Sequence, residues 1–161
     1  MSFTDIFAAI EEGTVDDVRY FVEQKGVDVN TKNKFAQSLL NLAVVHKKVD
    51  VAKFLISKKA DVNAKDWGGL TPLMRAVVNG NIEFAEIFIS AGSDLNAKDN
   101  DGTTALHAAA MNGNIDFAKI LVSKGANVNA KTENNGLTPL GFAKKHGYTE
   151  MVQYLTSIGG V

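Results

Sequence analysis

The feature that most constrains this chain is a spacing of 33 residues that recurs along it. Asn63, Asn96 and Asn129 lie 33 residues apart, each at the start of an Asn-Ala-Lys segment. The clearest copy of the repeating unit is residues 99–131, with the sequence DNDGTTALHAAAMNGNIDFAKILVSKGANVNAK. We interpret the chain as imperfect copies of this unit. With 161 residues, nearly half of them apolar, it has enough material for one domain with a continuous core.

The copy at 66–98 carries the signals of a turn and two short helices. Thr71 is a capping residue type, and Pro72 follows at the first helical position, where its missing N–H does no harm. Gly80 ends this helix, and Gly92 ends the next one. Between the two glycines, apolar residues recur at the spacing of one buried helix face: Ile82, Ala85, Phe88 and Ile89.

A short motif marks the same place in three of the units. It reads Thr-Pro-Leu-Met-Arg-Ala at 71–76, Thr-Ala-Leu-His-Ala-Ala at 104–109 and Thr-Pro-Leu-Gly-Phe-Ala at 138–143. A TPLHxA-like motif within a 33-residue period resembles the ankyrin repeat, whose unit is a β-turn plus two helices. The resemblance implies an all-α ankyrin-repeat solenoid, built of stacked helix-turn-helix units with short β-hairpin turns.

The resemblance extends over the chain as a single ankyrin repeat domain, 1–161, of five repeats. Polar residues on the outermost faces suit terminal repeats that shield the core from water. In the last repeat Thr149 and Thr156 stand where the unit at 99–131 has apolar residues. The predicted division is an N-terminal capping repeat at 1–32, internal repeats at 33–65, 66–98 and 99–131, and a C-terminal capping repeat at 132–161.

The first repeat begins without a preceding turn. Ser2 or Thr4 is expected to cap its first helix, while Asp5 favours the positive end of that helix. Its second helix is predicted at about residues 15–23, with an apolar face for its neighbour. The opposite face is polar and suits solvent: Asp16, Asp17, Arg19 and Glu23.

The second repeat departs from the others where glycine is expected. Ala36 replaces the glycine of the turn, Lys47 the glycine between the helices and Lys59 the glycine after the second helix. Each place favours a left-handed backbone, which costs a non-glycine residue about 1 kcal/mol or more. Apolar residues still recur at helical spacing, so this repeat is expected to fold on the support of its neighbours and to be locally the weakest.

Charge and composition exclude several classes of protein. The formal net charge of −1 predicts neither general nucleic-acid affinity nor membrane attraction. Residues 1–32 carry seven acidic and three basic residues (net −4), whereas 33–65 carry two acidic residues and seven lysines (net +5). The sequence has no cysteine, no signal-peptide pattern and no apolar run long enough to span a bilayer. We therefore expect a cytoplasmic protein that neither spans nor binds a membrane.

No arrangement of residues indicates catalysis. His46 and His146 occupy the same place three repeats apart, so their rings are expected about 25–30 Å from each other, too far to share a metal. His107 belongs to the motif, and the resemblance implies that it hydrogen-bonds the turn backbone. Acid pairs such as Glu11 and Glu12 suit a solvated helix surface. We predict that the chain is not an enzyme and has no metal or cofactor site.

The resemblance also implies where a partner binds. In ankyrin proteins the turn tips and the first helices line a concave face, and most partners are proteins held there. The contact positions are tip residues, the residue before the capping threonine and the two residues before the inter-helix glycine. In the internal repeats these partner-binding candidates are Lys34, Phe35, Val45, His46, Trp67, Leu70, Val78, Asn79, Asn100, Asp101, Thr103, Met111 and Asn112.

Large apolar side chains at several of these positions predict binding energy concentrated in a few anchors. Phe35, Trp67 and Leu70 stand on tips, and Val45, Val78 and Met111 stand behind them. Trp67, the only tryptophan, is the leading candidate for an anchor. The alternative is that Trp67 folds over the neighbouring tip and stabilises the array.

We therefore predict a monomeric, non-catalytic module that binds a protein partner through its concave face, as an adaptor or as an inhibitor. The alternative function is nucleic-acid or anionic-ligand binding through the lysine-rich second repeat. Hardly any arginine and few aromatic residues accompany those lysines, which disfavours a dedicated single-strand binder.

Overall fold

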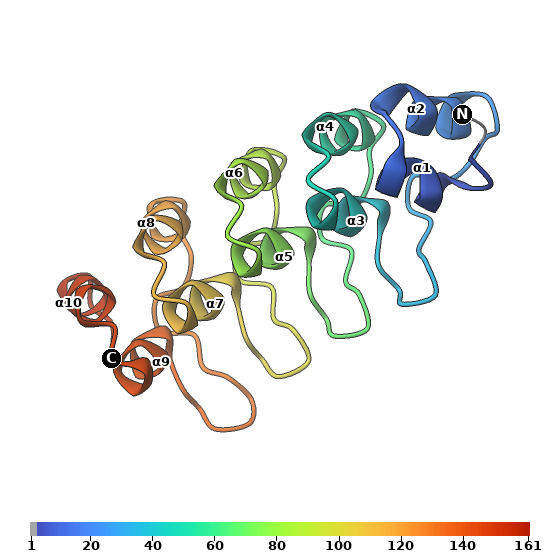
Figure 1. Cartoon of the computed structure of the whole chain (residues 1–161). Coiled ribbons are helices and arrows are strands. Elements are labelled where there is room, and N and C mark those ends of the chain that lie inside the picture. The colour runs from blue at the N-terminus through green and yellow to red at the C-terminus, as the bar shows by residue number, and fades with distance from the viewer. Residues whose placement is uncertain (1–2) are drawn as a thin grey trace.

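The computed structural model describes residues 3–161 and shows helices that pair and stack along one axis (Figure 1). The first helix of each pair belongs to an inner row and the second to an outer row, and extended turns project from the inner row. This confirms the all-α solenoid. The helices are α1 (Ile6–Glu12), α2 (Val15–Glu23), α3 (Leu39–Val45), α4 (Val49–Ser57), α5 (Pro72–Val78), α6 (Ile82–Ser90), α7 (Ala105–Met111), α8 (Ile115–Ser123), α9 (Pro139–His146) and α10 (Thr149–Ser157).

The inner helices of the later repeats begin where the motif predicts. A hydroxyl oxygen accepts a hydrogen bond from the backbone N–H three residues on, at 3.1 to 3.4 Å, which satisfies one of the unpaired donors of the first turn. Pro72 and Pro139 occupy the first helical position of α5 and α9. The capping residues are Ser38, Thr71, Thr104 and Thr138.

The first helix is capped differently from the expectation. Asp5 is its capping residue, and one carboxylate oxygen accepts from the backbone N–H groups of Phe7 and Ala8, each at 2.9 Å. The prediction of Thr4 was wrong because the carboxylate one residue later reaches both donors and also suits the positive helix end. Ser2 lies outside the described residues.

A column of alanine residues runs through the inner row. Because a methyl side chain takes little space, adjacent inner helices pack closely on one another along the row. Each inner helix contributes one alanine from the same place in the repeat, and none of the five has exposed surface: Ala9, Ala43, Ala76, Ala109 and Ala143. The core is therefore continuous from the first repeat to the last.

A ladder of hydrogen bonds holds successive repeats in register. The side-chain oxygen of Asn30 accepts from the backbone N–H of Asp61 at 2.8 Å. The same bond recurs one repeat later in each case, from Asp94 to Asn63 at 2.8 Å, from Asn127 to Asn96 at 2.7 Å and from Val161 to Asn129 at 3.0 Å. A slip of one residue between neighbouring repeats would break every one of these hydrogen bonds. The ladder therefore explains why the repeats keep a spacing of 33 residues.

The second repeat adopts the left-handed backbone that its position requires, without glycine. Ala36, Lys47 and Lys59 have φ angles of 57°, 55° and 67°. In residues 3–161 they are the non-glycine residues with positive φ, and glycine stands at the matching places of the other internal repeats. The expectation of a left-handed backbone at these three places is confirmed.

Replacing Lys47 or Lys59 by glycine is expected to raise the free energy of unfolding by about 1 kcal/mol each, because glycine adopts a positive φ without a Cβ clash. Both lysines are exposed, so little packing is lost. Urea unfolding followed by circular dichroism measures the change. The matched control is Lys53→Gly within α4, where right-handed backbone makes glycine cost about 1 kcal/mol. A Lys47→Gly chain that is less stable than the native chain contradicts the assignment of strain.

Candidate binding surface

A stripe of exposed apolar side chains runs along the inner row. Val45, Val78 and Met111 occupy the same place in α3, α5 and α7, and they are 41%, 48% and 38% exposed. The residues at this place in the first and last repeats are Glu11 and Lys145. The stripe therefore spans the three internal repeats and ends at a charged residue on either side.

The extended turns form four tips beside this stripe, which we define as tip 2 (33–38), tip 3 (66–71), tip 4 (99–104) and tip 5 (132–138). In three of them the first side chain closes the turn. One oxygen of Asn33, Asp66 or Asp99 accepts from two backbone N–H groups of its own tip at 2.8 to 3.0 Å. These bonds hold each tip in one conformation. We call the surface formed by the inner helices and the tips the concave face.

Tips 3, 4 and 5 are joined through their backbones. The N–H of Asn100 donates to the carbonyl of Gly68 at 3.1 Å, and the N–H of Glu133 donates to the carbonyl of Asp101 at 3.0 Å. A Cβ atom added to Gly69 would lie 2.7 Å from Oδ1 of Asn100. Glycine is required there by the close approach of the next tip as well as by its φ of 79°.

Tips 2 and 3 meet through aromatic side chains instead. Ala36 replaces the tip glycine, and among the backbone hydrogen bonds of the described residues none joins these two tips. The rings of Phe35 and Trp67 meet edge to face, with centroids 6.0 Å apart and planes at 80°. Phe35 is 50% exposed and Trp67 68% exposed. Trp67 thus contacts the neighbouring tip and also leaves most of its surface to solvent.

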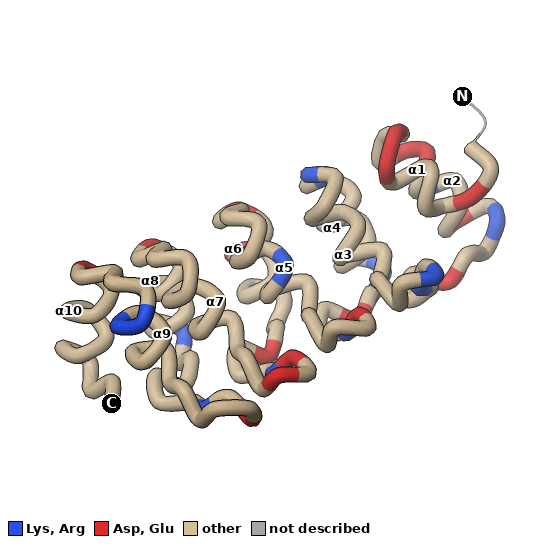
Figure 2. The backbone as a smooth tube through the Cα atoms, turned by 60° about the horizontal axis from the view of Figure 1, so that its bottom comes forward, with Lys and Arg blue, Asp and Glu red and all other residues tan. Residues whose placement is uncertain are grey.

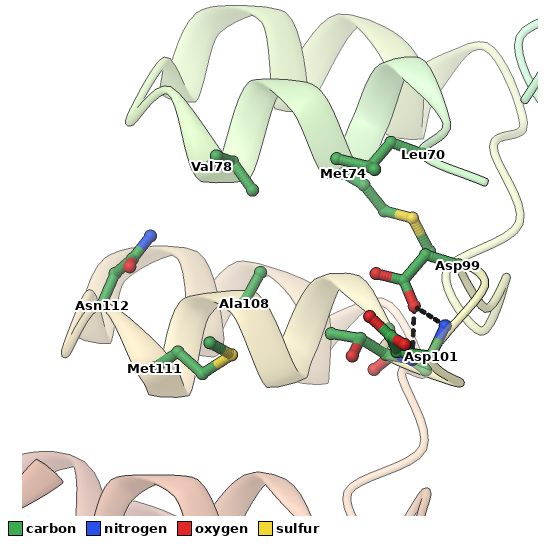
Figure 3. A pocket seen from close by; sticks show the side chains of 10 residues that line it. Leu70, Met74, Val78, Asp99, Asp101, Ala108, Met111 and Asn112 are labelled. Atoms are coloured by element: carbon green, nitrogen blue, oxygen red, sulfur yellow. Dashed lines mark hydrogen bonds between the residues drawn. The ribbon is translucent and has the colours of Figure 1, made fainter. Parts of the chain in front are cut away.

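A groove of about 290 Å³ lies on the concave face between repeats 3 and 4. Figure 3 shows Val78 of α5 and Met111 of α7 on opposite sides of it, with Asp99 and Asp101 at the end formed by tip 4. Its floor is apolar and one end carries carboxylates. The lining residues are Leu70, Met74, Val78, Asp99, Asp101, Thr103, Thr104, Ala108, Met111 and Asn112.

The structure gathers the predicted contact residues into two neighbouring places. The groove contains the candidates of repeats 3 and 4 that face each other: Leu70, Val78, Asp101, Thr103, Met111 and Asn112. The aromatic contact holds Phe35 and Trp67, with the ammonium of Lys34 5.1 Å from the centre of the Phe35 ring. The remaining candidates, Val45, His46, Asn79 and Asn100, lie outside the groove lining.

Sequence reasoning missed two residues that give the groove its character. Met74 stands at the histidine position of the motif and turns the groove floor apolar. Asp99 is the first residue of tip 4, and its carboxylate closes the turn. Because the turn alone explains an aspartate at this place, the sequence does not reveal that Asp99 also lines the groove. The replacement of histidine by methionine was the available signal for Met74.

The lysines of repeat 2 make contacts within the chain. The ammonium of Lys48 donates to the carbonyl of Gly13 at 2.8 Å. Lys58 pairs with the carboxylate of Glu23 at 2.8 Å, and this hydrogen bond lowers the pKa of Glu23 below its ordinary value. Figure 2 shows acidic segments on α1 and α2, beside repeat 2. The acidic first repeat therefore offsets part of the positive charge of the second.

His107 is a buried structural residue. Its Nδ1 atom accepts from the backbone N–H of Thr104 at 3.1 Å, and Nε2 lies 3.0 Å from the carbonyl of Leu137 in tip 5. These partners fit the neutral ring with its proton on Nε2. Burial lowers the pKa of His107 below its ordinary value of 6.5, since the interior disfavours the charged ring. The hydrogen bond to the turn backbone that the family resemblance implies is confirmed.

In residues 3–161 no group of three or more His, Cys, Asp or Glu side chains is placed to hold a metal ion. The helices formed by the same residues include none that is both long and apolar enough to cross a membrane.

Comparison with known proteins identifies one family. A family model described as ankyrin repeats, in three copies, matches residues 6–99 and 73–160. The two matched ranges overlap and together contain every helix from α1 to α10. No curated protein matches the chain.

Acidification is expected to lower the free energy of unfolding, because the unfolded chain takes up a proton at the ordinary histidine pKa while the folded chain, with its lowered pKa, does not. The fall begins below about pH 6.5 and reaches at most about 1.4 kcal/mol per pH unit. Urea unfolding at about pH 7.5 and about pH 5.5 measures it.

The matched variant is His107→Asn, because Asn41 of repeat 2 holds the same place and its amide lies 3.5 Å from the carbonyl of Leu70. This variant is expected to lose most of the pH dependence in that interval. The same dependence in both chains contradicts the assignment to His107.

Proposed function

The chain belongs to the ankyrin-repeat family, and on that premise we propose that it binds a protein partner through the concave face of repeats 2–4. Ankyrin repeats are generally protein–protein interaction modules and are typically non-catalytic, and we propose the same for this chain. The observation that carries the proposal is that several large apolar side chains are exposed on the inner helices and tips of one face. The stripe from Val45 to Met111 lies beside the exposed Phe35 and Trp67 on the tips.

Soluble monomeric proteins rarely expose several large apolar side chains together on one face, and such a face marks an interaction surface. Partner side chains would cover Phe35 and Trp67 at one end of the face and enter the groove at the other. Aromatic residues with this much free surface are the usual anchors of an interface, because each removes a large apolar area from water at a small cost in side-chain entropy.

The backbone supports binding with little loss of conformational entropy. Side-chain oxygens close tips 2, 3 and 4, and backbone bonds join tips 3, 4 and 5. Surfaces held in the bound conformation before the partner arrives lose less freedom on binding. A rigid face of this kind suits an adaptor or an inhibitor. We further propose that the chain acts as a cytoplasmic monomer.

The second candidate function, binding of nucleic acid or another anion by repeat 2, has less support. Three of its seven lysines are already engaged: Lys48 and Lys58 make bonds within the chain, and Lys65 donates to the backbone carbonyl of Lys98 in the following repeat at 2.7 Å. A dedicated polyanion site needs several cations free to meet phosphates.

The test is affinity capture from a lysate of the source organism, with the native chain and a Trp67→Ala, Phe35→Ala double variant as baits. The native chain is expected to retain a protein that the double variant loses by about tenfold or more, because both anchors are removed. The purified protein is then titrated against each bait by calorimetry.

The control is a Tyr20→Ala, Ile82→Ala chain, which removes two exposed apolar side chains from the outer helices α2 and α6. The expectation that Ile82 lies on the buried face was wrong, because at the first position of α6 it remains 40% exposed. The control chain is expected to bind as the native chain does. Circular dichroism establishes that each bait is folded. Equal capture by the native and Trp67→Ala, Phe35→Ala chains contradicts the proposed face.

A further inference from the structure

We infer that the groove between repeats 3 and 4 receives an arginine or lysine side chain of the protein partner. The inference rests on the proposed function and adds the chemistry of the contact. Its basis is a difference between two repeats. Repeat 3 forms an ion pair between an acid and a base of its own, whereas repeat 4 has the acid at the same place but not the base.

Repeat 3 shows the complete arrangement. One carboxylate oxygen of Asp66 closes tip 3 by accepting from the N–H groups of Gly68 and Leu70, at 2.9 and 3.0 Å. The other oxygen pairs with the guanidinium of Arg75 on α5. The side chain of Asp66 is 6% exposed and that of Arg75 22% exposed, so the pair is shielded from water. The first residue of a tip can therefore bind a cation that lies over the inner helix.

Repeat 4 has the carboxylate but lacks the cation. Asp99 closes tip 4 through Oδ1, which accepts from the N–H groups of Asp101 and Thr103 at 2.9 and 2.8 Å. The residue at the place of Arg75 is Ala108, 33 positions later. Among the described residues Asp99 takes part in no ion pair. Its second oxygen is the equivalent of the one that pairs with Arg75 in Asp66, and no base of the described residues pairs with it.

The groove occupies the place where that base would lie. Ala108 and Asp99 both line it, and Figure 3 shows Asp99 at the tip end of the space above α7. Asp101 adds a second carboxylate at the same end, held by a hydrogen bond from the amide of Asn134 at 2.9 Å. Two fixed carboxylates on a partly enclosed surface attract one cationic group.

The neighbouring bases are already engaged. Arg75 pairs with Asp66, and the ammonium of Lys98 donates to the carboxylate of Glu133 at 2.8 Å. The two acids at the groove are therefore available to a cation from another molecule.

The apolar part of the groove fits the rest of such a side chain. Met74, Val78 and Met111 line the floor and sides. Arginine and lysine bury their aliphatic stems on apolar surface while the charged end reaches a polar site, and methionine adapts its shape to such a stem. A volume of about 290 Å³ is just below the range of small-molecule pockets, which run from about 300 to 1,000 Å³, and it suits one or two side chains.

The test uses n-butylguanidinium as the probe, with hexanoate as a probe of opposite charge and similar apolar length. Chains carry ¹³C-methyl methionine and alanine, so that NMR reports on Met74, Met111 and Ala108 directly. Butylguanidinium is expected to shift these three methyl signals in a saturable titration, and hexanoate is expected to leave them in place. Equal shifts with both probes, or none with butylguanidinium, overturn the inference.

Two variants change the charge at the groove and are expected to keep the fold. Asp99→Asn keeps an oxygen that can close the tip, as Asn33 does in tip 2. Ala108→Arg supplies from within the chain the base that repeat 3 already has. Each is expected to weaken the apparent affinity for butylguanidinium about tenfold, because a charged hydrogen bond is lost or already occupied.

The matched control is Asp94→Asn, which changes the net charge by the same amount at a residue outside the groove lining. Asn127 holds the same place in the next repeat and makes the same hydrogen bond to the residue two positions on, so this variant is expected to fold and to bind as the native chain does. Native-like probe binding by Asp99→Asn overturns the inference.

The captured partner separates this inference from the proposed function. A partner that depends on Trp67 but binds Asp99→Asn and Ala108→Arg as tightly as the native chain leaves the function standing and overturns the groove assignment. Selective probe binding without any partner that depends on Phe35 and Trp67 contradicts the proposed function alone. Self-association of the native chain that Ala108→Arg abolishes, measured by sedimentation, assigns the groove to a second copy and overturns a foreign partner.

Discussion

The packing of one repeat on the next is the constraint on which every other feature of this structure depends. Each helix has only seven to nine residues, too few to be stable alone in water. The buried alanine column and the asparagine ladder both consist of contacts between repeats. Because the stacked neighbours fix the position of each inner helix, the side chains that they leave exposed have defined positions too.

Much of the fold could be predicted from the sequence because its signals are local. The capping residues Thr71 and Thr104 and the apolar spacing of the following helices place the inner and outer rows within a residue or two. The error at Thr4 shows the limit of the method. A carboxylate one residue away competes for the same N–H groups, and only the geometry of the turn decides which side chain reaches them.

The candidate site was harder to predict because it depends on how closely neighbouring tips approach. The sequence placed Phe35 and Trp67 on adjacent tips but left open whether Trp67 faces solvent or its neighbour. In the structure it does both. Ala36 provides a physical reason. A Cβ atom occupies the place where glycine lets tips 3 and 4 bond through their backbones, and the aromatic rings meet at this junction instead.

In a repeat protein each residue can be compared with the residues at the same place in the other repeats. A residue that differs from these equivalents is therefore informative. Asp66 and Asp99 close equivalent tips in the same way, so the difference between them lies in what the second oxygen meets. A methyl group at residue 108 in place of a guanidinium opens part of the groove and removes the base that would neutralise Asp99. Since a carboxylate beside apolar surface gains most from a partner that is both aliphatic and cationic, the same substitution creates the space and determines the chemistry of the side chain that fits it.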